Sequence, residues 1–122
     1  MKAVFDTNIL IDYLNGLTQA KRELENHTTC VISVITWMEV LVGAKNQDEE
    51  AVIKSFLNGF EVIDISSSIR EKAVTIRKNM RLRLPDAVIL ATAKHLEVPL
   101  VTRNTKDFPA GTIDIRVPYS IS

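Results

Sequence analysis

Cysteine is almost absent from this chain: Cys30 is the only one among 122 residues. A single thiol excludes an internal disulfide framework, and its place in the run Thr29-Cys30-Val31-Ile32 favours a buried thiol over a nucleophile. Glycine and proline are scarce, at four residues each, and the overall composition is far from that of collagenous or disordered chains. We expect a cytoplasmic protein.

The chain also lacks an excess of charge of either sign, because 15 Lys and Arg residues balance 15 Asp and Glu residues. The whole molecule therefore gives no sign of a polyanionic partner. The longest stretch with few charges, residues 30–44, contains Glu39 and is shorter than the roughly 20 apolar residues of a membrane-spanning helix. Asp6 and Asp12 come too early for the apolar part of a secretory signal, so no membrane partner is expected.

What remains is the composition of an ordinary soluble domain, with 46% hydrophobic and 25% charged residues. A chain of this length buries more than about 60% of its unfolded surface, so it needs no disulfide, metal or partner merely to fold. No linker, repeat or low-complexity segment divides it. We expect a single domain over residues 1–122.

Apolar runs alternate with helical patterns along the whole chain. Strands are predicted at residues 3–5, 28–32, 61–65, 98–102 and 113–117, and helices at 9–14, 18–27, 34–43, 47–57, 66–79 and 85–96. Such alternation favours an α/β fold, a three-layer α/β/α sandwich with a mainly parallel central sheet. The last strand, ended by Pro118, is expected at an edge.

Polar residues directly after an apolar strand are candidate site residues, because ligands of parallel sheets bind at the carboxyl ends of the strands. Asp6 follows the strand 3–5, where an ionised carboxylate is costly without hydrogen bonds or a cation. The segment Asp6-Thr7-Asn8 would serve equally well as a helix cap. Taken alone, Asp6 leaves capping and function evenly balanced.

Two further acids lie in segments with few other charges. Glu39 belongs to a helix that is apolar nearly all round, which predicts burial. Thr36 and Glu39 also fit a capping box, but the apolar residues before Thr36 indicate that the helix already begins at Ser33. Asp86 opens a helix that carries no other charge until Lys94, although an acid in a first turn is favourable in any case.

Buried carboxylates that lie together raise one another's pKa unless a cation joins them, and hard oxygen ligands suit Mg²⁺ or Mn²⁺. Other charged side chains have simpler explanations. Asp48, Glu49 and Glu50 form the first turn of a helix, Asp12 and Glu71 are expected on exposed helix sides, and His27 and His95 lie at helix ends.

Four motifs occur in a fixed order: Val4-Phe5-Asp6-Thr7-Asn8, Ile35-Thr36-Trp37-Met38-Glu39 with Gly43, Leu84-Pro85-Asp86-Ala87-Val88-Ile89-Leu90-Ala91-Thr92-Ala93, and Val101-Thr102-Arg103-Asn104-Thr105-Lys106-Asp107-Phe108. Together they make the chain resemble PIN-domain ribonucleases, most closely the VapC-type toxins of bacterial toxin-antitoxin pairs. The resemblance spans nearly the whole chain. Each motif alone is weak, but the four in sequence are fairly specific.

The resemblance implies that Asp6, Glu39 and Asp86 bind a catalytic Mg²⁺ or Mn²⁺. It also implies that Thr7 or Asn8, together with Thr102, supports these ligands by hydrogen bonding.

A fourth acid is expected at the position of Asn104, where many relatives have Asp. The fourth role passes to Asp107, stays with Asn104 as a neutral ligand, or lapses, and the number of metal ions stays open with it.

The activity implied is metal-dependent hydrolysis of RNA phosphodiester bonds, in a homodimeric toxin that a cognate antitoxin neutralises. The alternative is a catalytically weak or inactive PIN-like domain that binds RNA or protein. A receiver domain or a haloacid-dehalogenase-like phosphatase fits less well, because Phe5 precedes Asp6 and Asn8 stands where a second acid is needed.

Basic residues are unevenly distributed along the chain. Residues 1–61 contain nine acids and five bases, whereas residues 62–122 contain six acids and ten bases. Many of these bases fall on one predicted helix and its exit, where Arg81 and Arg83 are candidates to bind RNA phosphates. Arg103 is a separate candidate. A solvated helix face is an equally good explanation of the basic run.

Overall fold

The structure, a computed structural model, describes residues 1–108 and 114–121. Its centre is a five-stranded parallel sheet in the order β3-β2-β1-β4-β5. The strands are β1 (Lys2–Phe5), β2 (Thr29–Ser33), β3 (Glu61–Ile63), β4 (Leu100–Val101) and β5 (Ile115–Arg116). The first strand of the chain is therefore the middle strand of the sheet, with β2 on one side and β4 on the other.

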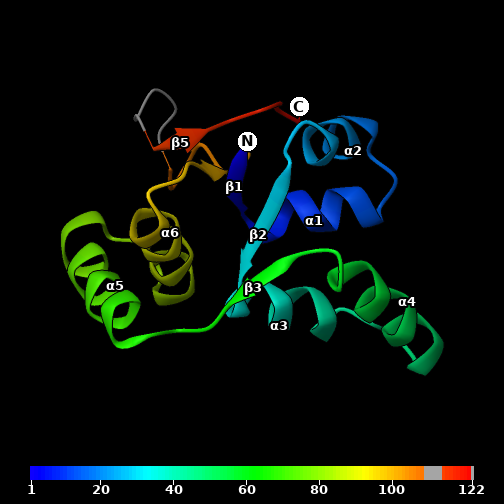
Figure 1. The fold of residues 1–122 in the computed structure, drawn as a ribbon, viewed down its shortest axis with the longest axis horizontal. Helices are drawn as coiled ribbons and strands as arrows, with labels where there is room; N and C mark the ends of the chain where they lie inside the picture. Colours follow the sequence, from blue (N-terminus) through cyan, green and yellow to red (C-terminus); the bar gives the residue numbers. More distant parts are fainter. Residues whose placement is uncertain (109–113, 122) are drawn as a thin grey trace.

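Among the described residues, six helices connect and cover these strands. They are α1 (Thr7–Leu14), α2 (Thr18–Glu25), α3 (Val34–Val42), α4 (Gln47–Leu57), α5 (Ser67–Met80) and α6 (Leu84–Leu96). Figure 1 shows α5 and α6 together on one side of the sheet and α1 to α4 on the other. Within the described residues, no helix is both long and apolar enough to cross a membrane.

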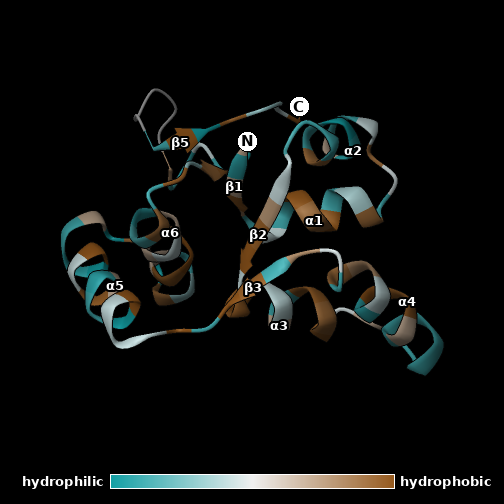
Figure 2. Ribbon diagram, viewed as in Figure 1, coloured by the Kyte–Doolittle hydropathy of each residue, from teal (hydrophilic) through white to brown (hydrophobic). Residues whose placement is uncertain are grey.

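Side-chain alternation along the strands divides the core in two. Val4 points into the cluster beneath α5 and α6, whereas its neighbours Ala3 and Phe5 point into the cluster beneath the other helices. Leu100 and Val101 divide between the two clusters in the same way. Figure 2 shows the resulting hydrophobic colouring on the inner strands. A sheet covered on both faces explains why the strands read as continuous apolar runs.

Short polar side chains begin several of the helices. Ser33, Asn46 and Ser66 each accept a hydrogen bond from a backbone N–H in the first turn of α3, α4 and α5, respectively. Gly16, just after α1, has a φ of 88°, a conformation that favours glycine. The start of α3 at Ser33 confirms the expected boundary and excludes Thr36 as the cap.

The α/β/α architecture and the parallel sheet confirm the prediction from sequence, and most helices begin and end within a residue or two of the expected positions. The predicted strand at 98–102 shortens to β4, and β5 forms the expected edge strand. Ile113, the first residue of the strand predicted at 113–117, lies outside the described residues.

One expectation was wrong: α3 is not buried all round. Thr36 and Val40 are buried on one side, whereas Met38 is exposed and Val42 is 83% exposed. The reason is geometric, because α3 packs one face against its neighbours and its apolar composition does not reveal which face has no partner.

Replacing Ile89 by Ala should destabilise the protein by about 2–5 kcal/mol, since Ile89 is completely buried in α6 and the change leaves a cavity. Urea unfolding followed by circular dichroism measures the loss. Val52→Ala is the control, because Val52 is largely exposed on α4 and its truncation should change stability by less than about 0.5 kcal/mol. Equal losses in the two variants would contradict the description of the core.

Candidate functional site

Asp6 lies at the carboxyl end of β1 and is 4% exposed. Its Oδ1 accepts a hydrogen bond of 2.8 Å from the backbone N–H of Thr7, so it does cap α1. Its Oδ2 accepts hydrogen bonds from Thr102 Oγ1 at 2.7 Å and from Asn8 Nδ2 at 3.2 Å. Capping uses one carboxylate oxygen, and the second is held by side chains from both ends of the sequence.

Glu39 approaches the same region from α3. Its Oε1 accepts a hydrogen bond of 2.6 Å from Thr7 Oγ1, which also lies 3.1 Å from Thr36 Oγ1. Glu39 itself is exposed, which corrects the expectation of a buried acid. The cause is the one-sided packing of α3, which turns Glu39 outward beside Met38.

Asp86 lies in the first turn of α6 and is buried. Its Oδ2 has no hydrogen-bond partner among the described residues. The nearest cationic atom is Arg83 Nε, at 3.6 Å, on a side chain that is largely exposed. A buried carboxylate oxygen without a hydrogen bond is uncommon, which makes Asp86 Oδ2 a candidate ligand for an ion or a water.

The electrostatics of Asp6 reveal uncompensated negative charge. Its pKa is raised to about 6, chiefly by burial and also by the charges of Asp86 and Glu39, against the hydrogen bonds of Thr102 and Thr7. Burial likewise raises the pKa of Asp86, opposed by Arg83 and assisted by Asp107 and Glu39. Each of the four acids therefore acts on at least one other, as expected for a single acidic site.

The loop after β4 brings the fourth acid to this site. Thr102 Oγ1 accepts a hydrogen bond of 3.0 Å from the backbone N–H of Asn104. The Asn104 amide donates to Asp107 Oδ2 at 3.0 Å and accepts from the Asp107 backbone N–H at 3.3 Å. Asn104 thus holds Asp107 in place, the behaviour of a supporting residue.

The donor set is chemically suited to a hard divalent cation, since it consists of carboxylate oxygens and one of them, Asp86 Oδ2, lacks a hydrogen bond. Across residues 1–108 and 114–121, no group of three or more His, Cys, Asp or Glu side chains is already arranged to hold an ion. The acids share one region, but closer approach is needed for joint coordination.

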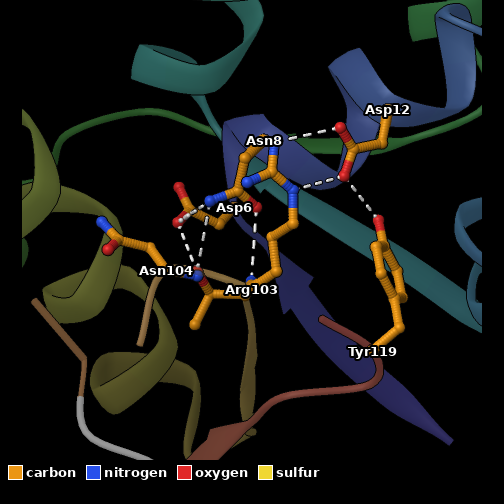
Figure 3. A network of polar contacts seen from close by, with 7 residues as sticks. Asp6, Asn8, Asp12, Arg103, Asn104 and Tyr119 are labelled. Carbon is orange, nitrogen blue, oxygen red and sulfur yellow. Dashed lines mark hydrogen bonds and ion pairs between the residues drawn. The ribbon is translucent and has the colours of Figure 1, made fainter. Parts of the chain in front are cut away.

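Asp12 was expected on an exposed helix side, and the structure corrects this: it is 6% exposed. Arg103 Nε donates to its Oδ2 at 2.6 Å and Arg103 Nη2 to its Oδ1 at 3.1 Å. Tyr119 Oη donates to the same Oδ2 at 2.9 Å. Figure 3 shows the Asp12 carboxylate held between Arg103 and Tyr119, beside Asp6 and Asn8.

A second buried acid, Glu23 of α2, also escaped the sequence analysis. Arg116 of β5 donates to its Oε2 at 2.6 Å and to its Oε1 at 2.8 Å, and His27 Nε2 lies 2.8 Å from Oε2. Burial opposes ionisation of Glu23, but these hydrogen bonds outweigh it and lower the pKa. The charged helix α2 therefore has one buried side, and His27, just after it, is buried against Phe5.

The basic candidates differ in their surroundings. Arg81 and Arg83 are exposed at the exit of α5, and Arg83 is close to Asp86. Arg103 is committed to Asp12 by two hydrogen bonds. Cys30 is half-buried, and burial raises the pKa of its thiol, which agrees with an unreactive cysteine.

These observations define a small α/β domain with an acidic, oxygen-rich site at the carboxyl end of its central strand. The PIN domain family matches residues 3–110, and the chain belongs to this family. Ribonuclease VapC1 of Methanocaldococcus jannaschii is 33% identical over 112 residues, which cover 88% of this chain and 79% of that protein.

Solved structures agree. A chain of a toxin-antitoxin complex from Klebsiella pneumoniae is 49% identical, with a TM-score of 0.91 over 98% of this chain and 99% of that chain. FitAcB from Neisseria gonorrhoeae is 21% identical, with a TM-score of 0.80 over 95% and 97% of the two chains, and shows the shared fold. The predicted PIN-like architecture is thereby confirmed.

Ionisation of Asp6 should destabilise the metal-free protein as the pH rises from about 4 to about 6. Because the pKa of Asp6 is raised from 3.8 to about 6, the unfolded chain loses this proton first, and the free energy of unfolding falls across that window. The fall attributable to Asp6 is on the order of 3 kcal/mol. Asp86, whose pKa is also raised, acts in the same direction.

Urea unfolding at a series of pH values in the presence of a chelator measures this effect. Asp6→Asn removes the titrating group, so its stability should depend less steeply on pH than that of the wild type. Identical dependence of stability on pH in the two proteins would show that the pKa of Asp6 is not raised in the folded state.

Proposed function

We propose that the protein is a metal-dependent endoribonuclease and the toxin of a toxin-antitoxin pair. The observation that carries this proposal is the group of four acids, Asp6, Glu39, Asp86 and Asp107, at the carboxyl end of the central strand. Within it Glu39 and Asp86 raise the pKa of Asp6, and Glu39 and Asp107 raise the pKa of Asp86. Similarity to Ribonuclease VapC1 supports RNA as the substrate class.

Asp6, Glu39 and Asp86 would hold the cation, Mg²⁺ or Mn²⁺, and Asp107 would complete the site. When bound, the cation supplies Lewis-acid stabilisation of the scissile phosphate and makes a coordinated water more acidic. Neighbouring side chains orient the ligands: Thr102 and Asn8 donate to Asp6, and Thr7 donates to Glu39.

Asn104 supports this site in a different way from an acid. Its amide donates to one oxygen of Asp107 and orients that carboxylate, whose other lone pairs stay available to a ligand. Asn104 itself is neutral, so the site has one negative charge less than it would have with an acid at position 104. We therefore assign the fourth role to Asp107 and a supporting role to Asn104.

Exposed arginines near the acids are the candidates to bind the RNA substrate. Arg83 Nε is 3.6 Å from Asp86, and a phosphate drawn to the site would meet its guanidinium. Arg81, at the end of α5, extends the same basic edge. Contacts of this kind grip the phosphate backbone of RNA without reading its sequence.

Two partners follow from the relatives. The Klebsiella pneumoniae structure is a toxin-antitoxin complex, so a cognate antitoxin is the proposed protein partner. A homodimer is proposed from the resemblance to VapC-type toxins alone. A cytoplasmic location suits an enzyme that acts on RNA.

The competing function is an RNA- or protein-binding PIN-like domain without catalysis. It is favoured by Asn104, which replaces an acid, and by the spacing of the described acids, which hold no ready-made cation site. A catalytic domain must gain both metal affinity and activity from the same acids.

Cleavage of a mixed RNA pool in Mg²⁺ or Mn²⁺ tests the proposal. Asp6→Asn and Asp86→Asn should each lower the rate by about 100-fold or more. Each removes a ligand of the cation, and the cation stabilises the transition state by several kcal/mol. A chelator should abolish cleavage by the wild type.

Glu71→Gln is the matched control, since Glu71 is exposed on α5, and it should cut RNA at the rate of the wild type. Mn²⁺ titration by calorimetry completes the test. Intact RNA with no acid-dependent Mn²⁺ affinity would favour the binding-only domain. Cleavage that persists in both Asn variants would mean that the active site lies elsewhere.

A further inference from the structure

Asp12 is a buried carboxylate outside the proposed metal site. It lies on α1, four residues after Asn8, and therefore on the same side of the helix one turn further on. Burial of an ionised acid is costly unless it is paired and hydrogen-bonded. Asp12 is satisfied by three hydrogen bonds, from two atoms of Arg103 and from Tyr119.

Arg103 connects this carboxylate to the loop Thr102–Phe108. Its side chain reaches Asp12, and its backbone N–H lies 3.5 Å from Asn8 Oδ1. The residue before it, Thr102, donates to Asp6, and the residue after it, Asn104, donates to Asp107. Arg103 thus lies in the chain between Thr102 and Asn104, which contact two of the proposed metal ligands. Figure 3 labels Arg103 beside Asp6 and Asn104.

The geometry points to Asp12 as a positioning residue: through Arg103 it fixes the loop Thr102–Phe108, and with it Asp107, relative to Asp6. This inference rests on the proposed function for its catalytic meaning, although the positioning itself is independent of it. Two parallel hydrogen bonds from a planar guanidinium fix orientation as well as distance, so the pair resists rotation of the loop.

The chain contains a matched pair that serves as a control. Glu23 is also a buried acid, and Arg116 binds it with two hydrogen bonds of similar length. Both pairs attach a late segment of the chain to an early helix. Arg116 contacts Thr102 through its backbone carbonyl, a bond that does not need the Glu23 side chain, whereas Arg103 lies inside the loop between Thr102 and Asn104. Loss of the Glu23 carboxylate should therefore destabilise the fold with little effect on the acidic site.

A different role for Arg103, direct binding of RNA, gives different expectations. The Arg103 side chain is 32% exposed and two of its nitrogens are occupied by Asp12. If Arg103 grips phosphate, its charge matters most and Lys should substitute for it. If it positions the loop, the planar two-bond geometry matters, and Arg103→Lys should fail as Asp12→Asn does.

Amide hydrogen exchange in the metal-free protein tests the positioning directly. The backbone N–H groups of Asn104, Asp107 and Phe108 are hydrogen-bonded within the loop and serve as probes. Asp12→Asn should accelerate their exchange by about tenfold or more, and Glu23→Gln by less than about twofold. Tyr119→Phe, which leaves the ion pair intact, should have an intermediate effect and serves if Asp12→Asn folds poorly.

Two measurements test whether the position of the loop matters to the acidic site: Mn²⁺ affinity in the absence of RNA, and then the kinetics of RNA cleavage. Asp12→Asn and Arg103→Lys should weaken Mn²⁺ binding by about 10- to 100-fold and lower kcat with little change in KM, whereas Glu23→Gln should keep the wild-type values. A raised KM with unchanged Mn²⁺ affinity in Arg103→Lys would assign Arg103 to RNA and overturn the inference.

The two proposals fail in distinguishable ways. Unchanged amide exchange and unchanged Mn²⁺ affinity in Asp12→Asn would overturn the positioning role, even if the wild type cuts RNA. A wild-type protein that binds no Mn²⁺ and cuts no RNA would instead overturn the proposed function. In that case the exchange comparison still decides whether Asp12 holds the loop.

Discussion

The structure depends on placing negative charge at the buried end of its central strand. Asp6 would be costly there without the hydrogen bonds from Thr7, Asn8 and Thr102, which come from two helical residues and from the end of the neighbouring strand. These bonds do not fully offset the burial, and the pKa of Asp6 stays raised. The domain therefore carries an electrostatic strain that a cation would relieve.

Two ion pairs with buried carboxylates and partly exposed arginines organise the rest of the molecule around this site. Asp12 with Arg103 and Glu23 with Arg116 attach the last part of the chain to the first two helices. Each arginine binds with two donors, a geometry that fixes orientation. Each arginine compensates the charge of a buried carboxylate. Removing one partner leaves the other charge unpaired, so the loss of stability should exceed what the intact pair contributes.

The sequence was sufficient for the fold and for the burial of Asp6 and Asp86, since both follow from a strand end and an uncharged helix. It was insufficient for Asp12 and Glu23, whose partners lie about ninety residues away along the chain. A local signal existed: each acid is three residues after a fully buried residue, Ile9 or Ala20, on the same helical face. The prediction for Glu39 was wrong in the opposite sense: it was expected to be buried and is exposed. Apolar composition does not show which side of a helix lacks a partner.

Chain order has a consequence for synthesis on the ribosome. β1 is made first, yet it is paired on one side by β4, and Asp6 receives its shortest hydrogen bond from Thr102, 96 residues later. Such distant contacts close only after most of the chain has emerged. A growing chain therefore has its first acid long before the residues that orient it, and the complete site is assembled last.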